Sequence, residues 1–282
     1  MPSTLLTCTS SSRPASPNAG DTLFETDTNK IITYSGSAWK EYEADGGETI
    51  TNGKSLHFDG TDDGLTVAGS SALDLDNNFT ISGWFKTDSN VSWSAIVWWG
   101  EAVAAKSRGF GLNSSGQLSF NGYAKFTSGQ TAVSTGTWYH GAVTIKENTA
   151  GNSQISTVYL NGAIDSMEKE TAGLADFTYS NTVIGQSNYG GAEHFDGMID
   201  EVAIWNRVLS PSEIAAIYNS GVANFNLLGN TGNYHSKGSL VGWWRMGDGT
   251  ENGSGTTIYD MSTNSNNMTM ASAPAYVTDV PS

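Results

Sequence analysis

Six carboxylates fall in two short Gly-containing stretches, FDGTDDG at 58–64 and FDGMIDE at 195–201. They are Asp59, Asp62, Asp63, Asp196, Asp200 and Glu201. Calcium takes six to eight oxygen ligands, chiefly carboxylates and backbone carbonyls, at ~2.3–2.6 Å. Acids on turns also accept hydrogen bonds from nearby backbone amides. The pattern therefore leaves two interpretations open, a calcium site or a pair of acid-capped turns.

Other residues that could do chemistry form weaker sets. The four histidines lack the spacing of zinc ligands, and His140 lies in an apolar strand pattern, WYHGAV, that is typical of a packed residue. Cys8 is the single cysteine, so it excludes an intrachain disulfide framework, and it has no convincing histidine partner. GDGTENGSG is rich in glycine but lacks the lysine of a phosphate-binding loop.

Sugar binding would use aromatic faces beside polar hydrogen-bonding groups. Trp93, Trp98 and Trp99 in SWSAIVWWGE, Tyr123 in NGYAKF and Tyr189 in SNYGG have such surroundings. The alternation of AIVWWGE also indicates that at least one of its tryptophans is buried in a core. The residues predicted to contact sugar are Trp93, Trp99, Tyr123 and Tyr189.

Composition sets the class of protein. The chain has 282 residues, 33 glycines, 6 prolines and 11% aromatic residues, which is typical of an all-β protein with many turns. Its net charge of −15 and the lack of a Lys/Arg cluster exclude nucleic-acid binding through phosphates. No apolar run approaches the ~20 residues needed to span a membrane, so we expect no membrane insertion. No basic start or apolar stretch precedes Leu5–Cys8, so we expect no signal peptide.

Strand patterns dominate residues 49–221. In FTISGWFKT (79–87), alternate residues face opposite sides, and TWYHGAVTI (137–145) behaves in the same way. In TVYLNG (157–162), Asn161-Gly162 supplies a hairpin turn. Apolar residues on both faces indicate strands that are covered on both sides.

One convincing helix follows Leu209. Ser210 is predicted as its N-cap, with Pro211 at the first helical position and Glu213 completing a capping box. Gly221 is predicted to end it. So short a helix requires docking onto a sheet, because isolated helices below ~12 residues are marginal.

Five motifs, in order, resemble a laminin-G-like domain of the concanavalin A-like lectin/glucanase superfamily. They are SLHFDGTDDGLTV, LDLDNNFTISGWFKT, TGTWYHGAVTI, STVYLNGAID and HFDGMIDEVAIWNRVLSPSEIAAIY, between Ser55 and Gly221. The resemblance implies a two-sheet antiparallel jelly-roll sandwich, often with structural calcium and often binding glycans. It implies Asp59 and Asp200 as the calcium side-chain ligands, with a carbonyl from Gly60.

The same superfamily contains glucanases, which carry acids at alternate positions of one strand. Glycoside hydrolysis needs two carboxyl groups ~5–9.5 Å apart across a cleft. Here Met198 stands where the first acid belongs, and the adjacent Asp200 and Glu201 are expected to face opposite sides of the strand. We therefore expect no enzymatic activity and no catalytic residues.

The tail, residues 222–282, departs from the family layout. LVGWWRMGDGT resembles the segment that normally opens such a domain. It could return a strand to the sandwich by circular permutation, or it could be a truncated second copy. We favour permutation, since the ends of such domains lie near each other. Permutation predicts that Val241–Arg245 pairs within the main sandwich.

Residues 1–48 are predicted to form an N-terminal β appendage, with TLFET and KIITY as strands. The stretch Arg13–Tyr42 resembles short segments of bacteriophage virion proteins, especially tail fibres. This implies attachment to other virion proteins or homo-oligomerisation through completed strand edges.

The sequence as a whole favours a non-enzymatic component of a virion surface. It would be tail-fibre-like or capsid-decorating, with a lectin-like domain at 49–221 that binds host glycans or stabilises the particle. The alternative is a secreted bacterial carbohydrate-binding module.

Overall fold

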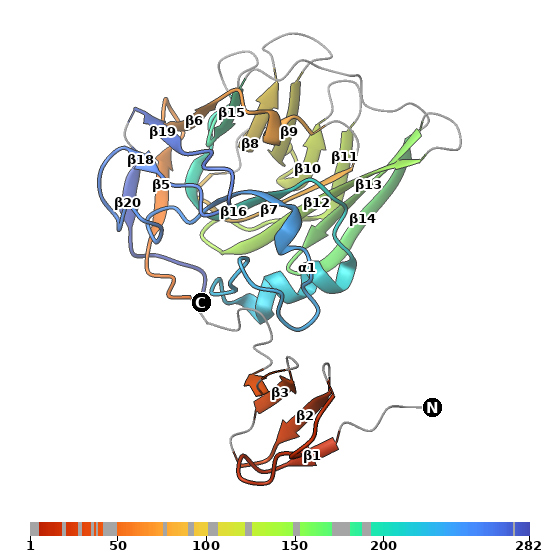
Figure 1. The fold of residues 1–282 in the computed structure, drawn as a ribbon. Helices are drawn as coiled ribbons and strands as arrows, with labels where there is room; N and C mark the ends of the chain where they lie inside the picture. The colour runs from red at the N-terminus through yellow and green to blue at the C-terminus, as the bar shows by residue number, and fades with distance from the viewer. Residues whose placement is uncertain are drawn as a thin grey trace.

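The computed structural model describes residues 6–18, 21–27, 30–34, 37, 39–41, 50–75, 78–89, 93–100, 107–121, 126–148, 153–170, 181–187, 193–272 and 274–282. Over these residues the chain forms three β-sheets and one short α-helix (Figure 1). No helix in the described ranges is long and apolar enough to cross a membrane.

A small N-terminal sheet contains both strands predicted there. Its strands, in sheet order, are β1 (Leu6–Cys8), β2 (Thr22–Glu25), β3 (Lys30–Tyr34) and β4 (Trp39–Glu41). β1 is parallel to β2, whereas the other pairs are antiparallel. Leu23 and Ile32 are buried, and Arg13 forms an ion pair with the buried Glu25. This sheet is drawn apart from the rest of the chain (Figure 1).

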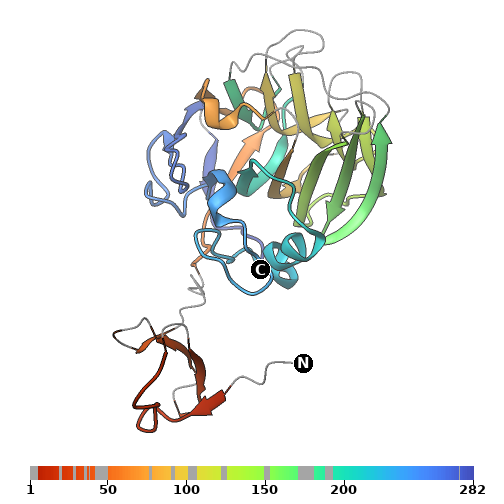
Figure 2. The same ribbon diagram turned by 45° about the vertical axis from the view of Figure 1, so that its right-hand side comes forward.

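The remaining strands form the two sheets of a sandwich (Figures 1 and 2). One, called here the β8 sheet, has the order β11-β10-β9-β8-β15-β6-β19-β18. Its strands are β6 (Gly64–Ala68), β8 (Ser94–Gly100), β9 (Ser107–Leu112), β10 (Gln117–Asn121), β11 (Phe126–Ala132), β15 (Asn181–Ile184), β18 (Thr257–Ile258) and β19 (Met268–Ala271). Its pairs are antiparallel, in agreement with the predicted fold class.

The other, called here the β16 sheet, has the order β14-β13-β12-β7-β16-β5-β20, with β17 also paired to β16. Its strands are β5 (Ser55–Asp59), β7 (Phe79–Thr87), β12 (Tyr139–Asn148), β13 (Ser153–Leu160), β14 (Ala163–Glu170), β16 (Asp196–Trp205), β17 (Leu240–Trp244) and β20 (Ala275–Val277). At the predicted hairpin, Asn161 and Gly162 have φ of 50° and 76°, the left-handed pair that a tight two-residue turn requires.

The main core lies between these two sheets. β7 shows the predicted alternation, since Phe79, Ile81 and Phe85 enter the core and Trp84 faces the other way. The β8 sheet contributes Trp99, among others. Each large apolar side chain buried in this way contributes roughly 1.5–3 kcal/mol, which makes this core the main source of stability.

A second apolar layer covers the outer face of the β16 sheet, as expected for strands covered on both sides. It includes α1 (Pro211–Tyr218), whose Ile214 and Ile217 are buried beside Trp205. The predicted capping box is present, because the Glu213 amide donates to Ser210 Oγ and the Ser210 amide donates to a Glu213 carboxylate oxygen, at 3.2 and 2.9 Å. The helix ends earlier than predicted, at Tyr218, because Asn219 adopts the left-handed conformation with φ 47°.

The C-terminal segment supplies strands to both sheets. β17 pairs with β16 through Val202–Trp205, within the sandwich. β19 pairs with β6, and β20 pairs with β5. Ser55 at the start of β5 lies opposite Val277 at the end of β20, so the two ends of the sandwich are neighbours.

Candidate functional site

A hollow of about 230 Å³ lies on the face of the β8 sheet that is turned away from the core. Its floor follows from the strand register, because laterally paired residues of neighbouring strands share a face. One row across the sheet is Trp98, Gly109 and Asn121, and the next is Ala95, Gly111 and Ser119. The central strand β9 contributes only glycines to these two rows, and the resulting hollow is called here the β9 pocket.

The two glycines are required by close packing. A Cβ at Gly109 would lie 2.1 Å from ring carbons of Trp98, and a Cβ at Gly111 would lie 2.2 Å from the carbonyl oxygen of Ser94. The Trp98 indole therefore rests on bare backbone. It also packs beside Ala95 and Val183, in a small cluster separate from the main core.

Two polar atoms that line the β9 pocket have no hydrogen-bond partner among the described residues. They are Trp98 Nε1 and Ser94 Oγ, on side chains that are 4% and 2% exposed. A buried polar group without a partner costs roughly 1–3 kcal/mol. The indole is a donor, and the hydroxyl is both donor and acceptor. Hydroxyl groups of a ligand would satisfy both.

Trp93 and Glu193 complete the lining of the pocket. Trp93 precedes β8, is half-buried and has φ 58°, an unusual value for a bulky residue and a feature that often accompanies function. Glu193 reaches the pocket from the segment before β16. Burial raises the pKa of Glu193, and a hydrogen bond with Ser187 opposes this shift.

The aromatic predictions are answered in part. Trp93 lines the β9 pocket, whereas Trp99 does not. Trp99 points into the main core, where it contacts the rings of Phe79 and Phe120. A β-bulge between Ala95 and Val97 changes which residues of β8 face outward, so Trp98 occupies the pocket instead. Tyr123 and Tyr189 lie outside the described residues.

The first acidic stretch forms a tight turn after β5. Carboxylate oxygens of Asp59, Asp62 and Asp63 lie within 4.8 Å of one another. Asp59 Oδ1 accepts hydrogen bonds from the amides of Thr61 and Asp62, at 2.8 and 3.4 Å, and Asp63 Oδ2 accepts from the Asp59 amide at 3.1 Å. Gly60 has φ 72°, and a Cβ there would lie 2.8 Å from Asp196 Cβ. The turn thus combines acid capping with a group of carboxylates.

Asp200 does not join this group. The residue paired with Asp59 is Asp196, and Asp200 lies four residues further along β16, roughly 13 Å away at ~3.3 Å per residue. The expected ligand set of Asp59, Gly60 and Asp200 therefore does not fit a single calcium ion. Asp59, Asp62 and Asp63 are the carboxylates that fit one.

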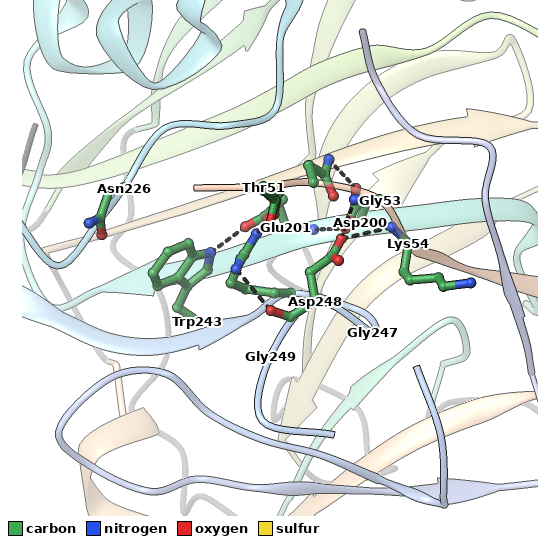
Figure 3. A network of polar contacts seen from close by, with 12 residues as sticks. Thr51, Gly53, Lys54, Asp200, Glu201, Asn226, Trp243, Gly247, Asp248 and Gly249 are labelled. Atoms are coloured by element: carbon green, nitrogen blue, oxygen red, sulfur yellow. Dashed lines mark hydrogen bonds and ion pairs between the residues drawn. The ribbon is translucent and has the colours of Figure 1, made fainter. Parts of the chain in front are cut away.

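Asp200 and Glu201 belong instead to a buried polar network (Figure 3). Glu201 accepts hydrogen bonds from Arg245 Nε at 2.9 Å and Trp243 Nε1 at 2.6 Å. Asp200 accepts from Asn52 Nδ2 at 2.8 Å and from the Glu201 amide at 2.8 Å. The network ties β16 to β17 and to the chain just before β5.

Further contacts extend the network to the turn after β17. Arg245 donates to the carbonyls of Thr51 and Asp248, at 2.5 and 2.9 Å. Asp248 accepts from the amides of Gly53 and Lys54, both at 2.7 Å (Figure 3). Segments from three parts of the chain are therefore joined around one buried arginine.

Burial dominates the protonation of the two neighbouring acids. Burial raises the pKa of Asp200 well above its usual range, and the charge of Glu201 raises it further. Burial also raises the pKa of Glu201 to about 7, although Arg245 and Trp243 favour its charged form. Of the two carboxyl groups, Glu201 is the one that Arg245 contacts and holds toward its charged form.

These contacts also bear on the hydrolase geometry. Asp200 is paired with Trp84 on the outer face, and Glu201 lines a cavity together with Trp84. The two acids therefore share a face, and the expectation of opposite faces is wrong. A β-bulge after Asp200, with φ 46° at Glu201, changes the alternation. Both carboxyl groups are held in structural contacts.

That cavity contains a further unusual residue, His140. The cavity lies under α1, and Ile217, Phe225 and Leu227 also line it. His140 is 1% exposed, and neither ring nitrogen has a hydrogen-bond partner within the described ranges. Burial lowers the pKa of His140 to about 3, so the ring is neutral. This confirms the prediction of a packed histidine.

Comparison with known families identifies the fold. Residues 59–215, more than half of the chain, match the laminin G 3 family, described as the concanavalin A-like lectin/glucanases superfamily. The chain belongs to this family. No curated protein matches the sequence.

Solved structures agree at the level of the fold. A protein from Bacteroides ovatus ATCC 8483, to which carbohydrate binding has been ascribed, matches with TM-score 0.59 and 18% identity, covering 83% of this chain and 62% of that one. This chain thus spans less than two thirds of that protein's length.

Two further similar structures match less closely. The carbohydrate-binding module CBM40 of the Ruminococcus gnavus IT-sialidase, bound to α2,3-sialyllactose, has TM-score 0.48 and 15% identity, covering 61% of this chain and 100% of that one. A SAP-like pentraxin from Limulus polyphemus has TM-score 0.47 and 18% identity, covering 66% and 88%. The chain has the concanavalin A-like fold of the family to which it belongs.

Proposed function

We propose that the protein is a non-enzymatic glycan-binding protein and that the β9 pocket holds the sugar. The observation that carries this proposal is the pair of buried, unpartnered polar atoms, Ser94 Oγ and Trp98 Nε1, in one pocket. Sugar hydroxyls both donate and accept, so one ring can satisfy both atoms while it packs against the Trp93 and Trp98 side chains.

Ser94→Ala is expected to weaken glycan binding about 3- to 10-fold, which corresponds to one hydrogen bond of ~0.5–1.5 kcal/mol. Its thermal stability should stay equal or rise, because the lost hydroxyl has no partner in the part of the chain that the structure describes. Trp98→Ala should weaken binding at least ~30-fold, as for other central aromatic contacts. Binding is first detected on an oligosaccharide array and then measured by calorimetry with the strongest ligand.

The exposed Tyr259, which does not line the pocket, provides a matched control as Tyr259→Ala. Binding that is unchanged in both Ser94→Ala and Trp98→Ala would reject the pocket. A folded protein that binds no glycan on the array would reject the function.

We also propose that the protein lies on a virion surface, as a tail-fibre-like or capsid-decorating component. The resemblance of Arg13–Tyr42 to segments of phage virion proteins supports this. Residues 1–48 would attach the chain to other virion proteins or to copies of itself, and the sandwich would face host glycans. Immunogold labelling of purified particles tests this location, and labelling absent from every particle surface would reject it.

A secreted bacterial carbohydrate-binding module is the second candidate. The fold likeness to the Bacteroides protein favours it, at the level of architecture alone. Glycan binding without association with particles would support this alternative. Particle association without glycan binding would instead indicate a structural cement protein.

Calcium is proposed at the turn after β5, held by the carboxylates of Asp59, Asp62 and Asp63. Calcium at about 100 times its dissociation constant should stabilise the protein by ~2.7 kcal/mol, a rise of roughly 5–10 °C in melting temperature. Asp62→Asn/Asp63→Asn should abolish this rise, whereas Asp200→Asn should retain it. Scanning fluorimetry with calcium or EGTA makes the measurement, and equal melting temperatures in both would contradict the site.

A further inference from the structure

We infer that the β9 pocket is selective for uncharged sugars and that Glu193 is the residue that excludes anionic ones. The inference rests on the proposed function, because it names the class of glycan that the same pocket takes. It assigns a specificity role to a residue that the aromatic pattern of the sequence did not indicate.

The ionisable group of the β9 pocket is a carboxyl group. Among the described residues that line it, Glu193 alone carries an ionisable side chain. The others are aromatic, aliphatic, serine, asparagine and glycine residues. The chain as a whole has a net charge of −15, so its long-range field also repels anions.

The hydrogen-bonding groups of the pocket match those of a neutral sugar. A carboxylate accepts hydrogen bonds but does not donate, so Glu193 suits the hydroxyl or N-acetyl N–H donors of a sugar. Trp98 Nε1 donates to a ring or hydroxyl oxygen, and Ser94 Oγ can do either. Neutral sugars offer donors and acceptors side by side, which matches this set.

Burial adds to this preference. Glu193 is half-buried, and this partial removal from water raises its pKa. A second carboxylate or a sulfate in this hollow would lose water and meet a like charge. Among the described lining residues, no lysine or arginine is present to compensate it.

The test compares neutral sugars with related sugars that carry one carboxylate. The pairs are lactose and 3′-sialyllactose, cellobiose and cellobiouronic acid, and N-acetylglucosamine and N-acetylmuramic acid. Each neutral ligand found on the array is also compared with its own carboxylated or sulfated form. Wild-type protein is expected to bind the neutral member of each recognised pair at least ~10-fold more tightly at pH 7.5 and 150 mM salt.

Glu193→Gln, which preserves shape, should reduce that ratio at least ~5-fold, chiefly by tighter binding of the anionic member. Glu147→Gln, on β12 of the other sheet, makes the same change in net charge and should leave the ratio unchanged. Melting temperatures confirm that each variant is folded.

Three outcomes would overturn the inference. Equal or tighter binding of the anionic members by wild-type protein rejects it and leaves glycan binding standing. A ratio unchanged in Glu193→Gln rejects Glu193 as its cause. A folded protein that binds no glycan rejects the inference and the proposed function together.

Discussion

Arg245→Met is expected to lower the free energy of unfolding by about 3–5 kcal/mol at pH 8, the usual cost of leaving a buried charge unpaired. Arg245 and Glu201 are 7% and 8% exposed, and Arg245 Nε lies 2.9 Å from Glu201 Oε1. Methionine keeps much of the packing of the arginine stem. The loss therefore reports chiefly the unpaired carboxylate and the broken bonds to Thr51 and Asp248.

The pH dependence of this loss distinguishes charge from packing. Burial already raises the pKa of Glu201 to about 7, and removal of Arg245 raises it further. Both proteins therefore carry a proton on Glu201 by pH 5, and the penalty should be smaller there than at pH 8 by up to ~1.4 kcal/mol, which corresponds to the one pH unit above the wild-type pKa. Urea unfolding at pH 5, 6, 7 and 8 gives the series.

A double-mutant cycle completes the test. Glu201→Gln/Arg245→Met should recover most of the loss at pH 8, because no buried charge remains. The exposed Arg207 lies 3.9 Å from Glu213, and Arg207→Met should change stability by less than about 0.5 kcal/mol. A loss in Arg245→Met that is equal at pH 5 and pH 8 would contradict a charged Glu201.

His140→Leu is expected to protect the protein against acid. The folded-state pKa of His140 is about 3, below the unfolded value of ~6.5, so the unfolded chain binds the extra proton between these values. Stability from the neutral ring is complete above pH ~6.5 and is lost as the pH falls, by ~1.4 kcal/mol per unit. By pH 4 the variant should gain roughly 3 kcal/mol relative to wild type.

The free energy of unfolding is measured against pH for wild type and for His140→Leu. The difference between the two proteins isolates the contribution of His140. Glu201 and Asp200 have raised pKa values, so they bind more protons when folded and oppose His140 between pH ~4.5 and ~6.5. That opposing contribution is shared by wild type and variant. At pH 8 the variant should be as stable or about 1 kcal/mol more stable, since two unpartnered ring nitrogens are removed. His235→Leu, at an exposed site, controls for the loss of a histidine. If the free energies of unfolding of the two proteins differed by the same amount at every pH from 3 to 8, titration of His140 would be rejected as the cause.

Local patterns predicted the regular elements well. The alternation of residues 79–87 gives β7 its two faces, and Ser210 with Glu213 gives the capped start of α1, because both signals act within a few residues. β18, β19 and β20 carry no such signal. They are only two to four residues long, and β19 and β20 pair with β6 and β5, which are distant in sequence.

Two β-bulges account for errors in the candidate sites. The bulge near Ala95 puts Trp98 in the pocket and Trp99 in the core, and the bulge after Asp200 puts Glu201 on the same face as Asp200. Strict alternation along a strand predicts the reverse in each case. The separation of Asp59 from Asp200 arises from the register of β5 against β16, which neither sequence stretch encodes alone.

The network around Arg245 also has a mechanical meaning. A pull applied through the N-terminal sheet enters the sandwich along residues 51–55. There the force first reaches two hydrogen bonds, from Arg245 to the Thr51 carbonyl and from the Asn52 side chain to Asp200. It then reaches the bonds from the backbone amides of Gly53 and Lys54 to Asp248. Beyond this anchor, β5 is flanked by β16 and β20, whose hydrogen bonds must shear together rather than open one at a time. A tethered sandwich would therefore resist detachment at the residues that surround the buried ion pair of Arg245 and Glu201.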